Sequence, residues 1–138
     1  MAARGNVQAM GSAAHESILD FRIDEERAGG GAVVLALHGD ADLHAAPMLS
    51  RRLDGAIDAG ASGIVVDVSD VPFFDSTALG VLVAGMKRLR ATRRQLRLVA
   101  PRAEVRRLLE LTLLDRVLGV DATRDEALTL VARERRLF

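Results

Sequence analysis

The sequence predicts an α/β fold in which a small mixed β-sheet carries about four α-helices on one of its faces. Short β-branched runs alternate along the chain with longer stretches in which apolar residues recur at helical spacing. The chain has 138 residues, enough for one compact domain and too few for two, and 49% of them are hydrophobic. No internal repeat or linker divides it, so we expect a single domain.

The first elements are two strands joined by a turn. Phe21 and Ile23 alternate with polar neighbours, and a triple glycine at 29–31 separates them from the apolar run 32–37. A helix should follow from Pro47 to about residue 59. Proline is tolerated in a first turn, and apolar residues recur there at helical spacing at Leu49, Leu53 and Ile57.

The middle of the chain predicts a strand, a helix and a second strand. Residues 64–68 form a β-branched run of the kind found in a strand covered on both faces. The following apolar positions are typical of an amphipathic helix and comprise Leu79, Leu82, Val83, Met86 and Leu89. The short apolar segment 96–100 then predicts a parallel strand reached by a right-handed crossover.

Three further elements complete the predicted domain. A third helix fits 102–111, a short fifth strand is expected at 116–120, and Thr123 caps a last helix that reaches about residue 132. With four helices over one face, the other face of the sheet should be exposed.

Residues 1–20 are expected to form a disordered N-terminal tail, and residues 21–134 the folded domain. The tail lacks the continuous apolar stretch of a signal peptide. The longest run without a polar residue, 78–86, is about half of the roughly 20 residues that a membrane span requires. We therefore expect no membrane insertion, and the absence of cysteine is compatible with a cytoplasmic location.

Composition excludes several classes of site. Without cysteine there are no disulfides, thiolate zinc sites or cysteine nucleophiles. The 19 basic and 19 acidic residues give a net charge of zero, and aromatic residues make up 3% of the chain. Because general attraction to phosphates and base-stacking rings are both lacking, we expect no direct nucleic-acid binding.

The segment from Asp67 to Gly80 joins the buried strand to the amphipathic helix and has the most unusual chemistry. A serine directly before an apolar helical pattern is a natural N-cap, because its oxygen can accept a free backbone N–H bond. On this interpretation Ser76 is only a cap. The full capping box is missing, since Leu79 stands where Glu or Gln would be expected.

The same segment, Asp75-Ser76-Thr77-Ala78-Leu79-Gly80, resembles the phosphorylation motif of bacterial anti-sigma factor antagonists, which are STAS-domain proteins. Gly39-Asp40-Ala41-Asp42, followed by Ala45-Ala46-Pro47 and a helix, is similar to the first strand-to-helix junction of that family. The order of predicted elements agrees from about Phe21 to Ala132. The resemblance therefore implies the STAS fold.

The resemblance also implies a role for each motif residue. Ser76 would accept phosphate from an anti-sigma factor that is a serine kinase of the histidine-kinase-like ATPase type, and a serine phosphatase would remove it. The partner-binding residues would be Asp40, Asp42, Asp75, Ser76 and Thr77. Unmodified protein would bind the anti-sigma factor and release a sigma factor, and phosphorylation would switch this off. No catalytic residue, cofactor or metal is implied, so the chain is not expected to be an enzyme.

Two departures from the family pattern bear on this interpretation. Ala78 stands where many relatives have glycine, and Thr77 places a second hydroxyl in the same turn, so the choice of Ser76 depends on the family motif. An alternative function is a STAS subunit with a structural role in a stressosome or a lipid-transport complex, in which Ser76 is never phosphorylated. The sequence leaves open the oligomeric state and the identity of the sigma factor, kinase and phosphatase.

Other constellations in the sequence are weaker. The histidines at 15, 38 and 44 are more typical of ordinary surface or loop histidines than of a metal site, and the Gly-x-Ser-x-Gly elbow of a serine hydrolase is absent. The region from the second to the third helix is locally basic and is either a solvated face or a contact surface for an acidic partner or nucleic acid. Its arginines are Arg88, Arg90, Arg93, Arg94, Arg97, Arg102, Arg106 and Arg107.

Overall fold

The computed structural model describes residues 14–18 and 20–136, with side chains described from 20 to 132. Its six strands form a single sheet, and their bounds are β1 Ala14–Ile18, β2 Phe21–Arg27, β3 Val33–His38, β4 Ile64–Asp70, β5 Leu96–Val99 and β6 Gly119–Asp121. The α-helices of the described chain are α2 Ala46–Asp58, α3 Ser76–Ala91, α4 Ala103–Leu111 and α5 Arg124–Arg136. Two single-turn 3₁₀ segments add η1 Gly29–Gly31 and η2 Leu114–Arg116. The α/β fold class with a mixed sheet and four helices is therefore confirmed.

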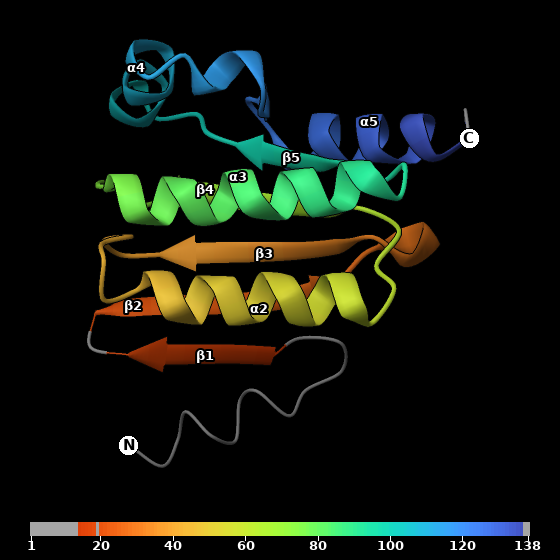
Figure 1. The fold of residues 1–138 in the computed structure, drawn as a ribbon, viewed down its shortest axis with the longest axis horizontal. Helices are drawn as coiled ribbons and strands as arrows, with labels where there is room; N and C mark the ends of the chain where they lie inside the picture. Colours follow the sequence, from red (N-terminus) through yellow and green to blue (C-terminus); the bar gives the residue numbers. More distant parts are fainter. Residues whose placement is uncertain (1–13, 19, 137–138) are drawn as a thin grey trace.

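The strands follow one another across the sheet in chain order. The pairs β1/β2 and β2/β3 are antiparallel, whereas β3/β4, β4/β5 and β5/β6 are parallel. Helices α2 and α3 supply the crossovers on either side of β4 and run side by side across one face of the sheet (Figure 1). Since β3 and β4 are parallel, the loops that leave their carboxyl ends emerge at the same edge of the sheet.

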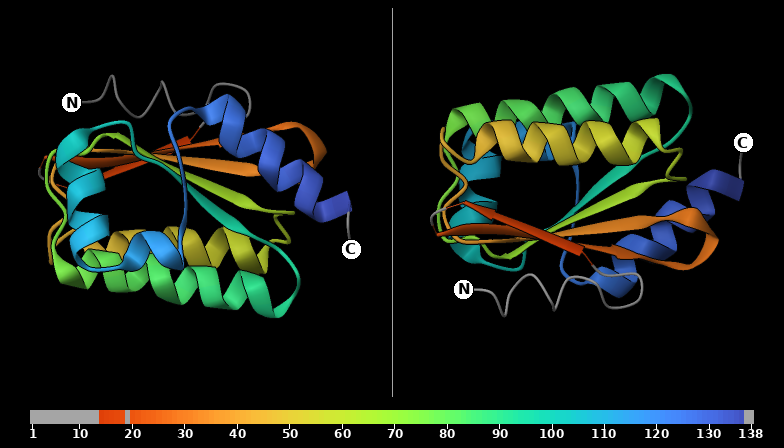
Figure 2. Two further views of the ribbon diagram at one scale, coloured as in Figure 1. Left: turned by 90° about the horizontal axis from the view of Figure 1, so that it is seen from above. Right: turned by 90° about the horizontal axis from the view of Figure 1, so that it is seen from below.

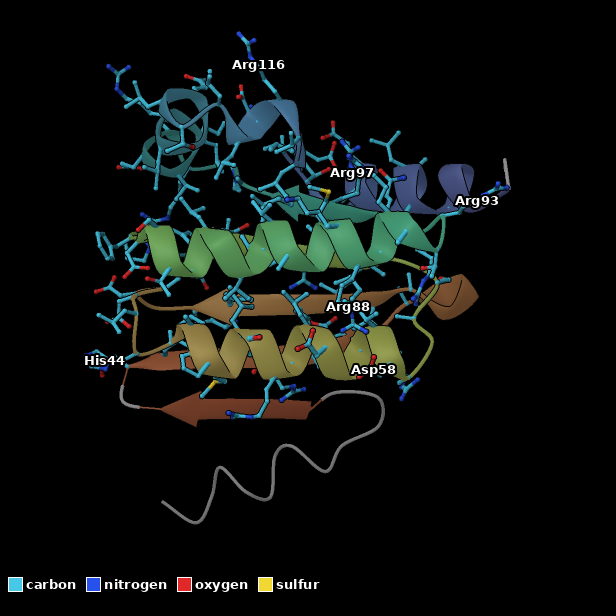
Figure 3. All side chains as sticks on the ribbon, in the orientation of Figure 1. His44, Asp58, Arg88, Arg93, Arg97 and Arg116 are labelled. Atoms are coloured by element: carbon cyan, nitrogen blue, oxygen red, sulfur yellow. The ribbon has the colours of Figure 1, made fainter. Side chains whose placement is uncertain are left out.

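The main core lies between the sheet and the helices α2, α3 and α4. Its fully buried members include Leu35 and Ile64 from the strands and Leu49 and Leu82 from the helices. The predicted central strand and the inward positions Leu82, Val83 and Met86 are found in this layer, Val83 being partly buried. On the outside of the layer, Arg88 of α3 bridges Asp54 and Asp58 of α2 at 2.8 and 2.7 Å (Figure 3).

The prediction that the second face of the sheet is exposed is wrong. Helix α5 lies on the opposite side of the sheet from α2 and α3 (Figure 2). It buries a second, smaller apolar cluster made of Ala32, Val34, Val65, Val99, Ala127 and Val131. Strands β3, β4 and β5 carry apolar side chains on both faces of the sheet. Helices must therefore pack on both faces to remove these side chains from water.

The prediction of a disordered tail up to Asp20 is wrong over Ala14–Ile18, which forms β1. This strand pairs with β2 through backbone hydrogen bonds, with Ala14 opposite Glu25 and Ile18 opposite Phe21. Only the first and last of its five residues are apolar, so the sequence offers no alternating pattern from which to predict a strand. Residues 1–13 lie outside the described part of the chain.

The fifth predicted strand is displaced toward the C-terminus. Residues 114–116 form η2 instead, and the strand β6 occupies only 119–121. Leu113 precedes η2 with a left-handed backbone, φ +61°. That conformation ends α4 and redirects the chain, and its use by a leucine is rare enough that the sequence pattern does not predict it. None of the helices in the described part of the chain is long and apolar enough to span a membrane.

Candidate functional site

The site predicted from the motif lies at the edge of the sheet where β3 and β4 end. Two loops meet there: the junction 39–45, which leads from β3 into α2, and the junction 71–75, which leads from β4 into α3. We call this surface, together with the first turn of α3, the switch edge. His44 marks its position at one end of the molecule in Figure 3.

Backbone hydrogen bonds join the two loops. The N–H of Ala41 donates to the carbonyl of Phe73 at 2.8 Å, and the N–H of Asp75 donates back to the carbonyl of Ala41 at 3.0 Å. A third bond links the N–H of Gly39 to the carbonyl of Asp70 at 3.1 Å. The loops therefore continue the pairing of β3 with β4 beyond the strands, and motif residues about 35 positions apart are held next to one another.

Buried apolar side chains fix the same loops to the core. Ala41 and Val71 are completely buried, and Phe74 is 4% exposed. All three belong to the main hydrophobic cluster under α2 and α3. The polar residues next to them in the chain, Asp40, Asp42 and Asp75, therefore lie toward the surface.

Asp75, not Ser76, is the N-cap of α3. Asp75 has an extended backbone, and its carboxylate accepts a hydrogen bond from the N–H of Ala78 at 3.0 Å. Ser76 is already the first helical residue. The interpretation of Ser76 as a cap is therefore wrong. Aspartate and serine are both good N-cap residues and stand side by side here, so the sequence alone does not decide which of them caps the helix.

The hydroxyls of Ser76 and Thr77 are both presented to solvent. The two residues are exposed, whereas the next two, Ala78 and Leu79, are buried. Within the described part of the chain, neither hydroxyl makes a hydrogen bond to the protein. Both are consequently sterically open to an enzyme that modifies serine or threonine.

The predicted partner-binding aspartates differ in their surroundings. Asp42 is half-buried, and its carboxylate accepts hydrogen bonds from the N–H groups of His44 at 2.9 Å and Ala45 at 3.0 Å. These bonds shape the turn into α2, so Asp42 has a structural task. Asp40 is exposed, and among the described residues it has no such partner. The structure thus brings Asp40, Asp42 and Asp75 to one edge but leaves only Asp40 fully available.

Two large apolar side chains also project from the switch edge. Leu43 is 59% exposed and Phe73 is 49% exposed. Neither is predicted as a site residue from the sequence. The available signal was a leucine within the polar loop Asp40-Ala41-Asp42-Leu43-His44, and a second phenylalanine beside the buried Phe74. Exposed aromatic and aliphatic groups on a surface of this kind are typical anchors of protein interfaces.

The switch edge is acidic. Residues 39–45 and 70–77 contain four aspartates and neither lysine nor arginine. His38, at the end of β3, contacts the Asp70 carboxylate at 2.8 Å and the Asp24 carboxylate at 3.2 Å. Among side chains of residues 20–132, no group of three histidine or acidic residues is arranged to hold a metal ion.

Asp67 supports the edge from the second face of the sheet. Burial opposes its ionisation, but hydrogen bonds from Ser69 and from Arg124 at 2.7 Å outweigh that effect and hold the pKa of Asp67 below its ordinary value. Arg124 also contacts Glu26 at 3.2 Å. This network ties α5 to β2 and β4. Asp67 lies in β4, four residues before Val71, where the loop that carries the motif begins.

Comparisons with known proteins agree with this geometry. The STAS domain family model matches residues 22–127. A Thermotoga maritima protein described as a candidate anti-sigma factor antagonist is 36% identical over 81 residues, which is 59% of this chain and 72% of that protein.

Two solved structures extend the comparison. The anti-sigma factor antagonist from Mycobacterium paratuberculosis is 29% identical with a TM-score of 0.76, and the match covers 85% of this chain and 99% of that one. The Bacillus cell-fate determinant SpoIIAA in its phosphorylated form is 26% identical with a TM-score of 0.63, covering 79% of this chain and 98% of that one. The chain therefore belongs to the STAS domain family, and its relatives from Thermotoga maritima and Mycobacterium paratuberculosis carry the name anti-sigma factor antagonist.

Proposed function

We propose that this protein is an anti-sigma factor antagonist that acts in the cytoplasm as a binding protein without catalytic activity. It binds an anti-sigma factor through the switch edge, so that a sigma factor is released. Phosphorylation of Ser76 by that anti-sigma factor, acting as a serine kinase, ends the interaction, and a serine phosphatase restores it. The exposed hydroxyl of Ser76, free of any capping role, carries this proposal.

The position of Ser76 suits a phosphate acceptor. Because Asp75 supplies the cap, modification of Ser76 does not remove a hydrogen bond that the helix needs. The residue lies in the first turn of α3, where free backbone N–H groups and the positive end of the helix dipole favour an added anion. A phosphorylated structure of the relative SpoIIAA adds support from the family.

Leu43 and Phe73 supply the attractive part of the proposed interface. They flank the first turn of α3 on the two loops that the backbone bonds of Ala41 hold together. Burying such side chains against a partner contributes roughly 25 cal/mol for each Å² of apolar surface removed from water. Asp40 and the open hydroxyls of Ser76 and Thr77 provide the polar groups that orient the partner around these anchors.

The charge of the switch edge explains how phosphate changes binding. A phosphoserine adds about 1.5 to 2 negative charges to an edge that already carries Asp40, Asp42 and Asp75. Inside the domain, the helix N-terminus offsets this repulsion by about 0.3 to 1 kcal/mol, so the fold should tolerate the modification. At a docked surface the same charge would be buried, which costs on the order of several kcal/mol unless the partner offers a cation.

A phosphorylation assay tests the assignment of Ser76. The protein is incubated with ATP and candidate anti-sigma serine kinases of the same organism, and any phosphate is mapped by mass spectrometry. We expect one phosphate on Ser76, absent from Ser76→Ala and retained in Thr77→Ala as the matched control. Phosphate on Thr77, or binding to such a kinase without any phosphate transfer, would contradict the proposal. Binding without transfer would favour a structural STAS subunit instead.

A further inference from the structure

A second surface with chemistry of its own lies beside the C-terminal half of α3. It is formed by the C-terminal end of α3, the end of α4 and the turn η2. Arg90 of α3 lies about 21 Å along the helix from Ser76, given a rise of about 1.5 Å per residue. Figure 3 shows Arg93 at the opposite end of α3 from His44, and Arg116 extending outward from the η2 turn.

A cationic pocket of about 290 Å³ opens on this surface. Four arginines contribute to its lining together with Asp115 and Val117, and they are Arg90, Arg94, Arg97 and Arg116. Arg97 is neutralised, because its guanidinium makes two hydrogen bonds of 2.8 Å to the buried carboxylate of Asp121. The remaining three arginines outnumber the single carboxylate of Asp115, so the pocket is cationic overall.

These three arginines have no carboxylate partner among the described residues. Arg94 donates through Nη1 to the carbonyls of Ala61 at 2.8 Å and Ile57 at 3.3 Å and through Nε to the hydroxyl of Thr92 at 2.7 Å, which orient the side chain without neutralising it and leave its Nη2 group unused within the described part of the chain. Arg90 has one long contact of 3.4 Å to the carbonyl of Val117. Arg116 is exposed. Guanidinium groups with unused donors are well suited to carboxylates, which they bind in a bidentate manner.

An exposed apolar group lies at the end of α4 and around η2, and one of its members, Val117, lines the pocket. Leu111 is 70% exposed, Leu113 is 56% exposed and Val117 is 41% exposed. All three lie in one compact turn, in which the N–H of Leu113 donates to the carbonyl of Glu110 and the N–H of Val117 to that of Leu114. The structure thus places the aliphatic side chain of Val117 among cations, in a part of the chain, residues 75–137, that contains no aromatic residue.

Leu113 is the most informative of these residues. Its backbone is left-handed, φ +61°, a conformation that glycine and asparagine adopt far more readily than leucine. Its side chain is mostly exposed, so packing in the folded domain does not compensate for the strain. Strained exposed residues tend to mark functional surfaces. Folding alone therefore does not explain why a leucine stands at this position.

We propose that this surface, made of Arg90, Arg94, Leu111, Leu113, Arg116 and Val117, binds an acidic segment of a partner protein that also carries large apolar side chains. The arginines would pair with carboxylates of that segment, and the leucines with its apolar residues. Nucleic acid fits less well, because the surface offers exposed leucines and no ring on which a base could stack.

Selection from a library of displayed random peptides tests the proposal and also identifies the peptide chemistry that the surface prefers. The wild-type protein is compared with the charge-reversal variant Arg90→Glu/Arg116→Glu and with Leu113→Gly, which suits the left-handed backbone and should fold at least as well as wild type. Arg27→Glu is the control, since it reverses the charge of an exposed arginine at the end of β2, on the far side of the sheet. Thermal melting checks that each variant is folded.

We expect the wild type and Arg27→Glu to enrich peptides that combine Asp or Glu with Leu, Ile or Phe. Their affinity should fall at least tenfold for the charge-reversal variant and for Leu113→Gly, without loss of melting temperature in Leu113→Gly. No enrichment, or peptides that bind all four proteins equally, would overturn the proposal. So would a random DNA duplex that binds the wild type, but not the charge-reversal variant, more tightly than any peptide.

Discussion

The carboxylate of Asp75 accepts a hydrogen bond from the backbone N–H of Ala78 at 3.0 Å, and this single contact leaves the neighbouring hydroxyl of Ser76 unused. Asp75 caps the helix and Ser76 does not, so phosphate can be added to Ser76 without loss of the cap. One residue holds the start of α3, and the next is available for chemistry. A cap that was itself phosphorylated would lose its bond to the helix each time the switch operated.

Replacement of the cap should therefore destabilise the domain, and replacement of Ser76 should not. We expect Asp75→Ala to lower the free energy of unfolding by about 0.5 to 2 kcal/mol, the usual range for loss of an N-cap. Ser76→Ala should change it by less than about 0.5 kcal/mol, as is usual for exposed positions. Chemical denaturation of both variants measures the difference. A larger loss in Ser76→Ala than in Asp75→Ala would show that the cap is misassigned.

The close approach of Gly39 to β2 gives a second prediction. Gly39 has φ +99°, and a Cβ at this position would collide with the carbonyl oxygen of Asp20. Gly39→Ala should therefore destabilise the protein by more than about 1 kcal/mol and displace the loop that carries Asp40. Gly29→Ala is the control, since a Cβ there meets nothing within 4 Å. Equal stability of the two variants in urea denaturation would contradict this account of the loop.

The network around Asp67 predicts a defined dependence on pH. Because the pKa of Asp67 lies below its ordinary value of 3.8, its ionised form stabilises the fold above about pH 4, and that contribution is lost as pH falls further. Asp67→Asn should reduce the free energy of unfolding by about 1 to 3 kcal/mol at neutral pH. The difference from wild type should shrink below about pH 4.

Asp54→Asn provides the matched control for Asp67. Asp54 also pairs with an arginine, at 2.8 Å, but its side chain is 52% exposed. An exposed ion pair contributes about 0 to 1 kcal/mol, so this variant should be nearly as stable as wild type. Denaturation curves recorded across acidic pH compare the three proteins. A loss of stability in Asp67→Asn that does not diminish in acid would show that ionisation of Asp67 is not its cause.

The exposed anchors of the switch edge should matter for binding and not for folding. Leu43→Ser and Phe73→Ser are each expected to weaken binding of the anti-sigma factor by about tenfold or more, which corresponds to about 1.4 kcal/mol. Val117→Ser, at a residue that is 41% exposed and lies beside Arg90 near the C-terminal end of α3, should retain full affinity. Calorimetric titration with one anti-sigma factor compares all three. Unchanged affinity in both Leu43→Ser and Phe73→Ser would place the interface elsewhere.

Elements with a strong local pattern could be predicted from the sequence. The β-branched run 64–68 and the helical spacing of Leu79, Leu82 and Met86 are local signals, and both lie where they were expected. The position of α5 was not predictable in the same way. Val34, Val65 and Val99 belong to strands that are apolar on both faces, so the pattern along each strand does not say which helix covers which face.

The site was predictable in part for a related reason. Parallel strands with adjacent carboxyl ends bring their loops together, and the resemblance to the family motif predicts Ser76, within one of these loops, as the phosphate acceptor. The exposure of Leu43 and the choice of Asp75 as cap depend on backbone geometry that residue types alone do not determine. Similarly, Leu113 adopts a left-handed conformation that its side chain disfavours, so the strand that follows was expected too early in the chain.

The central claim is that phosphate on Ser76 acts at the partner interface and not by unfolding the domain. Calorimetric titration of the anti-sigma factor with unmodified and with Ser76-phosphorylated protein, alongside denaturation curves of both forms, tests it most directly. We predict that phosphorylation weakens binding by a hundredfold or more, about 2.7 kcal/mol, while the free energy of unfolding changes by less than about 1 kcal/mol. Equal affinities of the two forms, or a phosphorylated domain that has lost most of its stability, would contradict it.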